Sequence, residues 1–396
     1  MRVVPVAIVL VIVLVLAGIQ WFRPIPAPTF HPLVSTVVHV PGSPPPLPWP
    51  TTGSAVLAVG GGGNLGHVGS TQPVPIASIA KVLTAYVVLK DHPLPLGDDG
   101  PAIVVTADTI SAYQVGVASQ QSEVTVAPGE ALTELQVLEG LLVASGNDMA
   151  TLLADWDAGS TSAFVAKMTA ASRDLGLEST RITDPSGLDP GTVSTPTDLI
   201  RLGEAAMAVP TFAEVVSMPQ VTLPLAGTIY NLDFLLGRDG FVGIKTGSDT
   251  AAGGCFLYEA QAVVGGTTLT LVGAVLGQDT GTPAASAVND ADALVRAAFA
   301  AARPLRLIAP GQQVGRITAP WGASVIVTAP SAPSVVGWPG LDVPIALEVG
   351  TLPSTIPRGA GVGLVGIVLG SKHLLVVMRS EGNLPGPSAV WRLTRL

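Results

Sequence analysis

The pattern of apolar and polar positions divides the chain into an apolar leader, a proline-rich stretch, a mixed body and a tail. After Met1 and Arg2 come about eighteen residues without a charge, and then Trp21, Phe22 and Arg23. At ~1.5 Å per residue a helix of this length nearly spans a hydrocarbon layer of ~30 Å, with the aromatic pair at the interface. We therefore expect residues 1–23 to be a transmembrane anchor, or a signal sequence cleaved near Val15–Ala17.

The next segment, 24–52, carries the pieces PIPAPTFHP and PGSPPPLPWP. Proline lacks an amide donor and fixes its own φ, so such a stretch forms neither helix nor central strand. We predict a partly extended linker.

In the body, strand-like runs lie at both ends and helical patterns lie between them. SAVLAV (54–59) and LGHVGS are strand-like around a glycine turn, and apolar residues from 76 to about 90 recur at helical spacing. Thr133 and Gln136 form a capping box, and Thr195 with Pro196 begins another helix. After 215 the pattern returns to strands, and NDADALVRAAFAAA closes the body as a helix near 302. This order predicts an α+β domain over 53–302 whose sheet joins both ends of the segment.

Residues 303–396 alternate short Val/Ile/Leu runs with proline and glycine turns and show no convincing helical pattern. We predict a small all-β domain, with the terminal AVWRLTRL as a strand.

Composition excludes several classes of function. Net charge is −9 without any basic run, which argues against nucleic-acid binding. The single cysteine, Cys255, forms no intrachain disulfide. None of the five histidines falls within 93–372, so neither a zinc site nor a Ser-His-Asp triad is expected in the body.

One pair of residues suggests chemistry in spite of these exclusions. Ser78 precedes Lys81 by three residues in the apolar stretch IASIAK, and the chain has only five lysines. A serine hydroxyl needs a base to become nucleophilic, and a desolvated lysine with a lowered pKa can serve. Residues three apart share one helix face. The pair alone is a weak signal, since a capping serine beside a solvated lysine is common.

Two further patterns strengthen it. Ser145-Gly146-Asn147 interrupts two helices, and Lys245-Thr246-Gly247 follows an apolar strand, where lysine and threonine offer donors to a carboxylate and glycine lets a substrate approach the backbone. Each pattern occurs once, in the order S-x-x-K, S-x-N, K-T-G. That trio marks class A β-lactamases and penicillin-binding proteins.

More closely, residues 54–300 resemble the low-molecular-weight penicillin-binding proteins, the serine D-alanyl-D-alanine carboxypeptidases. The resemblance implies the penicillin-binding/β-lactamase-like fold, an antiparallel sheet with a helical subdomain, followed by a second, β-rich domain. The stretches that carry it are ASIAKVLTA, LLVASGNDMATLLA, FVAKM, LGLESTRITDPSGLDP, STPTDL and VGIKTGSDTAAGGCF. Two departures stand out: Ala80 replaces the usual threonine, and DPSGL (184–188) replaces Asn-Pro-His-Gly-Leu.

The resemblance implies a role for each motif residue. Ser78 would be the nucleophile and Lys81 its base; Ser145 would relay a proton to the leaving D-alanine, and Asn147 would bind Lys81 and the substrate amide. On the strand, Lys245 and Thr246 would bind the terminal carboxylate beside Gly247. The amides of Ser78 and Ser248 would form the oxyanion hole.

The implied activity is removal of the terminal D-alanine from peptidoglycan stem peptides, with β-lactam antibiotics as covalent inhibitors and no metal or organic cofactor. The catalytic domain would lie outside the cytoplasm, held by a single-pass anchor at the cell membrane, or be secreted to the wall if the leader is cleaved. The alternatives are a D,D-endopeptidase, a non-catalytic peptidoglycan-binding protein and a class A-like β-lactamase. The last lacks its usual Glu-x-x-Leu-Asn stretch here, because Asn231, the only other asparagine between Asn147 and Lys245, follows GTIY.

Overall fold

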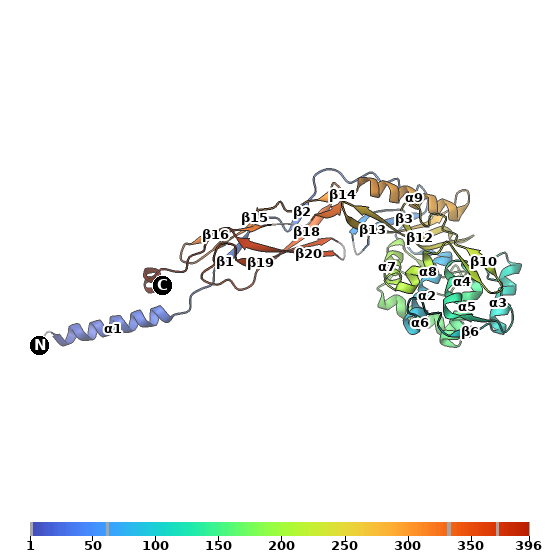
Figure 1. The fold of residues 1–396 in the computed structure, drawn as a ribbon, viewed down its shortest axis with the longest axis horizontal. Helices are drawn as coiled ribbons and strands as arrows, with labels where there is room; N and C mark the ends of the chain where they lie inside the picture. The colour runs from blue at the N-terminus through green and yellow to red at the C-terminus, as the bar shows by residue number, and fades with distance from the viewer. Residues whose placement is uncertain (1–2, 61–62, 331–333, 370–371, 396) are drawn as a thin grey trace. The chain divides into compact units, whose positions relative to one another are not determined.

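The computed structural model describes residues 3–60, 63–330, 334–369 and 372–395 (Figure 1). The chain divides into two compact units. One is Pro45–Arg303, and the other combines Met1–Pro44 with Pro304–Leu396.

A five-stranded antiparallel sheet forms the frame of the first unit. Its order is β11-β12-β13-β3-β4, so the early and late strands of the body join as predicted; the strands are β3 (Ser54–Val59), β4 (Gly63–Val68), β11 (Phe241–Asp249), β12 (Gly253–Val264) and β13 (Thr267–Gln278). Helix α9 (Pro283–Ala301) packs on β12 and β13. On β3, Val56 and Ala58 belong to the core shared with the other helices, while the alternate residues Ala55 and Leu57 are buried outside it. Both faces of the sheet are therefore covered, which explains the unbroken apolar run of β3.

The helical part of this unit lies between β4 and β11 in the chain. Its helices are α2 (Ala80–Asp91), α3 (Ala107–Ala118), α4 (Glu134–Leu142), α5 (Asn147–Ala158), α6 (Thr161–Asp174), α7 (Pro196–Met207) and α8 (Pro210–Val216), with the 3₁₀ turn η1 (Ala77–Ile79) before α2. Three short antiparallel pairs connect them: β5 (Val74–Pro75) with β8 (Val193–Ser194), β6 (Ala102–Val104) with β7 (Ala131–Thr133), and β9 (Gln220–Leu223) with β10 (Gly227–Tyr230). The predicted capping box of Thr133 and Gln136 and the predicted N-cap Thr195 are both confirmed.

The second unit is built on a seven-stranded antiparallel sheet, which confirms the predicted all-β region. Its order is β1-β15-β16-β20-β19-β18-β2; the strands are β1 (Thr29–Pro32), β2 (Val37–His39), β15 (Gln312–Thr318), β16 (Ser324–Ala329), β18 (Asp342–Glu348), β19 (Gly361–Leu369) and β20 (Lys372–Ser380). A further pair joins β14 (Arg303–Leu305) to β17 (Val335–Gly337). The terminal strand prediction is wrong: Ala389–Thr394 form a short helix, α10, because the Ser388 side chain caps it by accepting the Trp391 amide.

The proline-rich segment also differs from the predicted linker. Thr29–Pro32 (β1) pairs with β15, and Val37–His39 (β2) pairs with β18. These are the two edges of the sheet, where a strand needs only one set of ladder hydrogen bonds and proline is tolerated.

Helix α1 (Val3–Phe22) lies within the segment 1–23 predicted as an anchor or signal sequence, and its described apolar side chains, such as Ile8 and Leu14, are exposed. Within the described residues, no helix reaches the length and apolar character that a membrane crossing requires.

Candidate active site

The first motif lies where η1 passes into α2. Ser78 occupies η1 and Lys81 the first turn of α2, one turn further on. Their neighbours Ile76 and Ile79 are almost completely buried, which holds this turn in the core. Ala77, the residue before the serine, has a φ of +46°. This value lies in the left-handed region, which residues other than glycine rarely adopt.

Lys81 connects three parts of the site. Its Nζ donates to Ser78 Oγ at 2.7 Å, to Asn147 Oδ1 at 2.6 Å and to the Ser186 carbonyl at 3.2 Å. Burial lowers the pKa of Lys81 to about 7, although nearby carboxylates, Asp184 foremost, act in the opposite direction. A large fraction of Lys81 is therefore neutral near neutral pH and can accept a proton from the serine it contacts.

The second motif forms the turn between α4 and α5. Ser145 is 2 % exposed and has a φ of +62°, and Asn147 is the first residue of α5. A β-carbon on Gly146 would lie 2.8 Å from Asp148 Oδ1, which accounts for glycine at the middle position. The turn thus places the Asn147 side chain against Lys81.

The third motif lies on β11, an edge strand of the sheet. Lys245 is 3 % exposed, and burial, together with the charge of Lys81, lowers its pKa to about 7. Thr246 is equally buried, and its Oγ1 has no hydrogen-bond partner among the described residues. Such an unpaired buried hydroxyl is unfavourable unless a ligand uses it. Ser248, one residue past the motif, is exposed.

A carboxyl group also lies near Lys245. Burial raises the pKa of Asp233 to about 6, while the charge of Lys245 opposes this rise. Its Oδ1 accepts the Leu235 amide, and its Oδ2 has no partner in the described part of the chain. Lys245 is therefore the cation that this buried carboxyl faces.

A fourth element was noticed in the sequence only as a departure from the family pattern. In the loop 184–188, Asp184 accepts hydrogen bonds from the Ser186 amide and hydroxyl, the Leu188 amide and the Thr192 hydroxyl. Thr84 donates to the Pro185 carbonyl at 2.6 Å. The loop therefore presents the Ser186 carbonyl to Lys81 through its backbone, and no side-chain type in the sequence signals that contact.

The structure brings the three motifs together. Ser78, Lys81 and Asn147 share direct hydrogen bonds, and Lys245 is close enough for Lys81 to depress its pKa. Ser145 lies buried two residues before Asn147.

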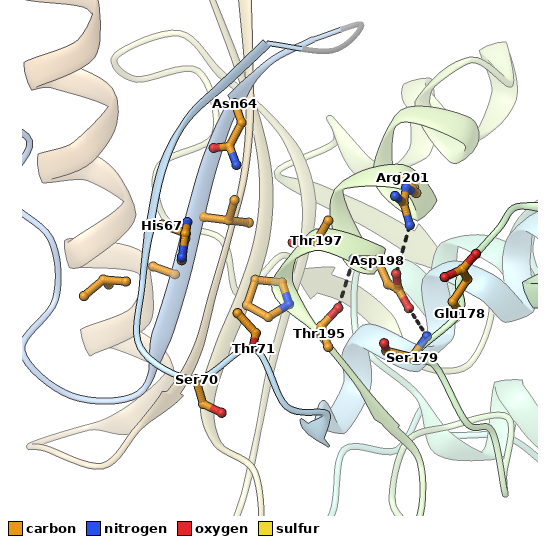
Figure 2. A pocket seen from close by; sticks show the side chains of 14 residues that line it. Asn64, His67, Ser70, Thr71, Glu178, Ser179, Thr195, Thr197, Asp198 and Arg201 are labelled. Atoms are coloured by element: carbon orange, nitrogen blue, oxygen red, sulfur yellow. Dashed lines mark hydrogen bonds and ion pairs between the residues drawn. The ribbon is translucent and has the colours of Figure 1, made fainter. Parts of the chain in front are cut away.

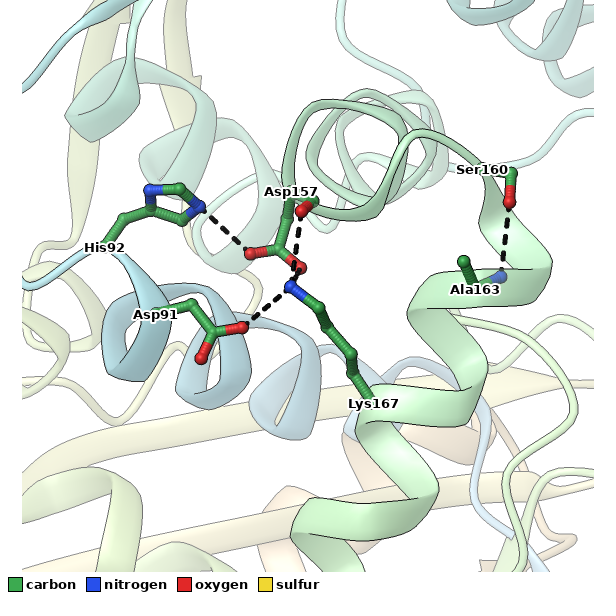
Figure 3. A network of polar contacts seen from close by, with 6 residues as sticks. All are labelled: Asp91, His92, Asp157, Ser160, Ala163 and Lys167. Carbon is green, nitrogen blue, oxygen red and sulfur yellow. Dashed lines mark hydrogen bonds and ion pairs between the residues drawn. The ribbon is translucent and has the colours of Figure 1, made fainter.

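Two other polar places contain none of the predicted site residues. A hollow of about 340 Å³ lies between β4 and the start of α7, where Asp198 accepts the Ser179 amide and the Arg201 guanidinium (Figure 2). At the far end of α2, Lys167 bonds Asp91 and the buried Asp157, tying α2 to α5 and α6 (Figure 3). We interpret the hydrogen bonds at both places as structural, because they join separate backbone segments or helices to each other.

A serine hydroxyl bonded to a buried lysine of depressed pKa, beside an edge strand with an unpaired threonine hydroxyl among the described residues, is the arrangement expected of a serine hydrolase. Residues 54–280 match the family described as D-alanyl-D-alanine carboxypeptidase, peptidase family S11. The chain belongs to this family of low-molecular-weight penicillin-binding proteins, which confirms the resemblance read from the motifs.

Individual relatives agree with this assignment. The chain is 40 % identical to the D-alanyl-D-alanine carboxypeptidase DacB2 of Mycobacterium tuberculosis, over 47 % of this chain and 62 % of that protein. It is 32 % identical to a Streptomyces D-alanyl-D-alanine carboxypeptidase, over 57 % of this chain and 82 % of that protein.

Solved structures show the same fold. The Streptomyces DD-transpeptidase, at 29 % identity, matches with a TM-score of 0.56 over 64 % of this chain and 99 % of its own. Penicillin-binding protein 5 of Haemophilus influenzae, at 21 % identity, matches in fold with a TM-score of 0.61 over 86 % of this chain and 99 % of its own.

Proposed function

We propose that the protein removes the terminal D-alanine from peptidoglycan pentapeptide stems through an acyl-enzyme on Ser78. The observation that carries this proposal is the 2.7 Å hydrogen bond between Ser78 Oγ and the fully buried Lys81 Nζ. Family membership supports the substrate class, and the geometry supports the choice of nucleophile and base.

In the acylation step, neutral Lys81 takes the proton of Ser78 as Oγ bonds the carbonyl carbon between the last two D-alanines. The oxyanion would accept hydrogen bonds from the amides of Ser78 and Ser248, an arrangement whose loss typically slows such reactions ~10²–10³-fold per donor. The carbon–nitrogen bond then breaks, and the departing amine receives the proton through Ser145. Water afterwards hydrolyses the ester and regenerates Ser78.

Recognition of the terminal carboxylate would fall to Lys245 and Thr246. The buried Thr246 hydroxyl has no partner in the part of the chain that the structure describes, and Lys245 would supply the positive charge. A β-lactam carries the same carboxylate next to a reactive carbonyl, so it would acylate Ser78 in the same orientation.

Labelling with a fluorescent penicillin tests the nucleophile. We expect one covalent adduct, on Ser78, and none in Ser78→Ala. An intact wild-type protein that takes no label would instead support the non-catalytic peptidoglycan-binding reading. A label that is released within seconds would support the β-lactamase reading.

Endopeptidase activity is the second candidate, because two relatives bear that name, one of them in Pseudomonas aeruginosa at 35 % identity over 161 residues. Parallel digestion of a synthetic pentapeptide and of a cross-linked stem dimer separates the two activities. We expect faster cleavage of the pentapeptide.

For location, we propose that residues 1–23 anchor the protein in the cell membrane with the catalytic unit on the outer side. The support is the uncharged run that ends at Trp21 and Phe22 and the exposed apolar side chains of α1. We assign catalysis to 53–302 and leave 303–396 as an accessory β domain. Membrane pellets washed with alkaline carbonate would retain an anchored protein and release a cleaved one.

A further inference from the structure

Two carboxylic side chains meet beneath the Ser-Gly-Asn turn, outside all three motifs. The amide of Asp148 donates to Glu123 Oε2 at 2.9 Å, and the amide of Val124 donates to both carboxyl oxygens of Asp148, at 3.1 and 3.3 Å. The segment before Val124 and the start of α5 are therefore held together by each other's acid groups. Asp148 is completely buried, and Glu123 is half-buried.

The two acids also affect each other's ionisation, because the Glu123 carboxyl adds to the burial that raises the pKa of Asp148. Burial raises the pKa of Asp148 to about 8 and also raises that of Glu123. Near neutral pH the completely buried Asp148 is therefore the member of the pair that favours the proton, and the half-buried Glu123 is the member better placed to carry a negative charge.

Glycines make room for this pair. A β-carbon on Gly116 would lie 1.8 Å from Glu123 Oε1, and one on Gly146 would lie 2.8 Å from Asp148 Oδ1. The acid pair therefore occupies a space between α3 and α5 that a side chain at either glycine would fill.

The pair reaches the catalytic lysine through one amide. Asn147 accepts from Lys81 at its Oδ1, its side-chain nitrogen donates to Gln121 Oε1 at 3.4 Å, and its backbone amide donates to the Ser122 carbonyl at 2.9 Å. The segment 121–123 therefore holds both the side chain and the backbone of Asn147, and Glu123 fixes this segment to α5 by accepting the amide of the next residue, Asp148. A continuous path thus runs from Lys81 through Asn147 to Glu123 and Asp148.

We propose that Glu123 is a positioning residue for acylation: it orients Asn147 against Lys81 and, with Asp148, supplies one negative charge for the ammonium that Lys81 becomes. This rests on the proposed roles of Ser78 and Lys81. The other groups that face Lys81 are the Asp184 carboxylate and the Ser186 carbonyl of the 184–188 loop, the Ser78 hydroxyl and the Lys245 ammonium; all of them stay in place in the variants below.

The test is the rate constant for labelling Ser78 with fluorescent penicillin, measured across pH. Glutamine at 123 still accepts the Asp148 amide and can donate to an ionised Asp148, so Glu123→Gln keeps one charge and should react within about twofold of wild type. Glu123→Leu loses the acceptor and should slow labelling about tenfold or more. A labelling rate that glutamine restores and leucine does not would show that the effect depends on hydrogen bonding and not on the size of the side chain.

The double variant Glu123→Gln, Asp148→Asn keeps the shape of the pair and removes its charge. Lys81 then loses anions that favour its charged form, so the acidic limb of the labelling profile should move down by roughly half to one pH unit. Glu178→Gln, an exposed change outside the site, is the matched control and should match wild type throughout.

Each part can fail separately. Equal rates for wild type, Glu123→Gln and Glu123→Leu would overturn the positioning role. An unmoved acidic limb in the double variant, whose fold circular dichroism would verify, would overturn the charge role. If Glu123→Leu does not fold, the labelling profile of the double variant decides whether the acid pair acts on Lys81. Absence of labelling in wild type would instead refute the proposed function itself.

Discussion

The Cα of Gly247 lies so close to Ser78 that a β-carbon there would be 2.9 Å from the Ser78 amide nitrogen. The glycine of the third motif therefore lets β11 approach Ser78, the proposed nucleophile. The same β-carbon would lie 3.3 Å from Ala77 Cβ and from the Ile76 carbonyl oxygen. Those atoms belong to a buried turn that has little freedom to move.

We predict that Gly247→Ala slows acylation of Ser78 by fluorescent penicillin roughly ten- to hundredfold, since displacement of reacting groups by a fraction of an ångström has effects of that order. Gly350→Ala, where a β-carbon meets nothing within 4 Å, is the control and should leave the rate unchanged. Wild-type rates in both variants would show that the close approach is unimportant.

The pH dependence of acylation should be bell-shaped. In the proposed mechanism Lys81 reacts as the neutral amine, and its pKa is lowered to about 7, so the rate should rise as pH increases through that value. In the same proposal Lys245 binds a carboxylate as the ammonium, and its pKa is also lowered to about 7, so the rate should fall as pH increases further. The maximum therefore lies near neutral pH.

Lys245→Arg separates the two limbs. Arginine stays protonated at all relevant pH values, so the alkaline limb should disappear, while the acidic limb stays at or below its wild-type position. Stopped-flow labelling from pH 5 to 10 would measure both limbs, with Lys90→Arg as control. An alkaline limb that persists unchanged would assign it to another group.

Thr246→Val should affect stability and activity in opposite directions. The Thr246 hydroxyl is buried and unpaired in the described structure, so an isosteric valine removes a desolvated polar group and should stabilise the fold by up to about 1 kcal/mol. Acylation should nevertheless fall about tenfold, because the carboxylate of the penicillin loses a donor. Thermal unfolding and labelling rates measured on the same sample check both signs. A less stable variant with unchanged labelling would contradict the assignment of this hydroxyl to substrate.

The network at the end of α2 should stabilise the helical part without affecting chemistry. Asp157 has a fully buried side chain that accepts from Lys167 at 2.7 Å and bonds His92 at 3.0 Å. Lys167→Met leaves that carboxylate without its charged partner and should lower the free energy of unfolding by about 2 kcal/mol. Denaturation followed by circular dichroism measures the loss.

The exposed pair of Lys90 and Asp174, 3.5 Å apart, gives the matched comparison. Lys90→Met should change stability by less than about 0.5 kcal/mol, because an ion pair in water contributes little. Similar losses in the two variants would mean that burial of Asp157 is not what makes the network stabilising.

The three motifs could be predicted because each is local and chemically specific. Ser78 and Lys81 are one helical turn apart whatever surrounds them, and Lys245 follows an apolar run that must be a buried strand. Helix caps such as Thr133 were predictable for the same reason: the stabilising contacts lie within one turn of the chain.

What could not be predicted depends on contacts between distant segments. The Ser186 carbonyl reaches Lys81 through the backbone, and Glu123 acquires its surroundings only when α3 and α5 pack together. Proline content predicted a partly extended linker over 24–52, but it did not predict that two pieces of this segment pair with the edges of the second sheet. Pairing partners follow from the assembled sheet and leave no local mark in the sequence.

The most direct measurement of the central claim is mass spectrometry of D-alanine released from a synthetic stem pentapeptide. The account predicts one D-alanine released per pentapeptide by wild type, and no release above the uncatalysed rate by Ser78→Ala or Lys81→Met, both folded by circular dichroism. Release by Ser78→Ala at the wild-type rate, or a folded wild-type protein that leaves the pentapeptide intact, would contradict it.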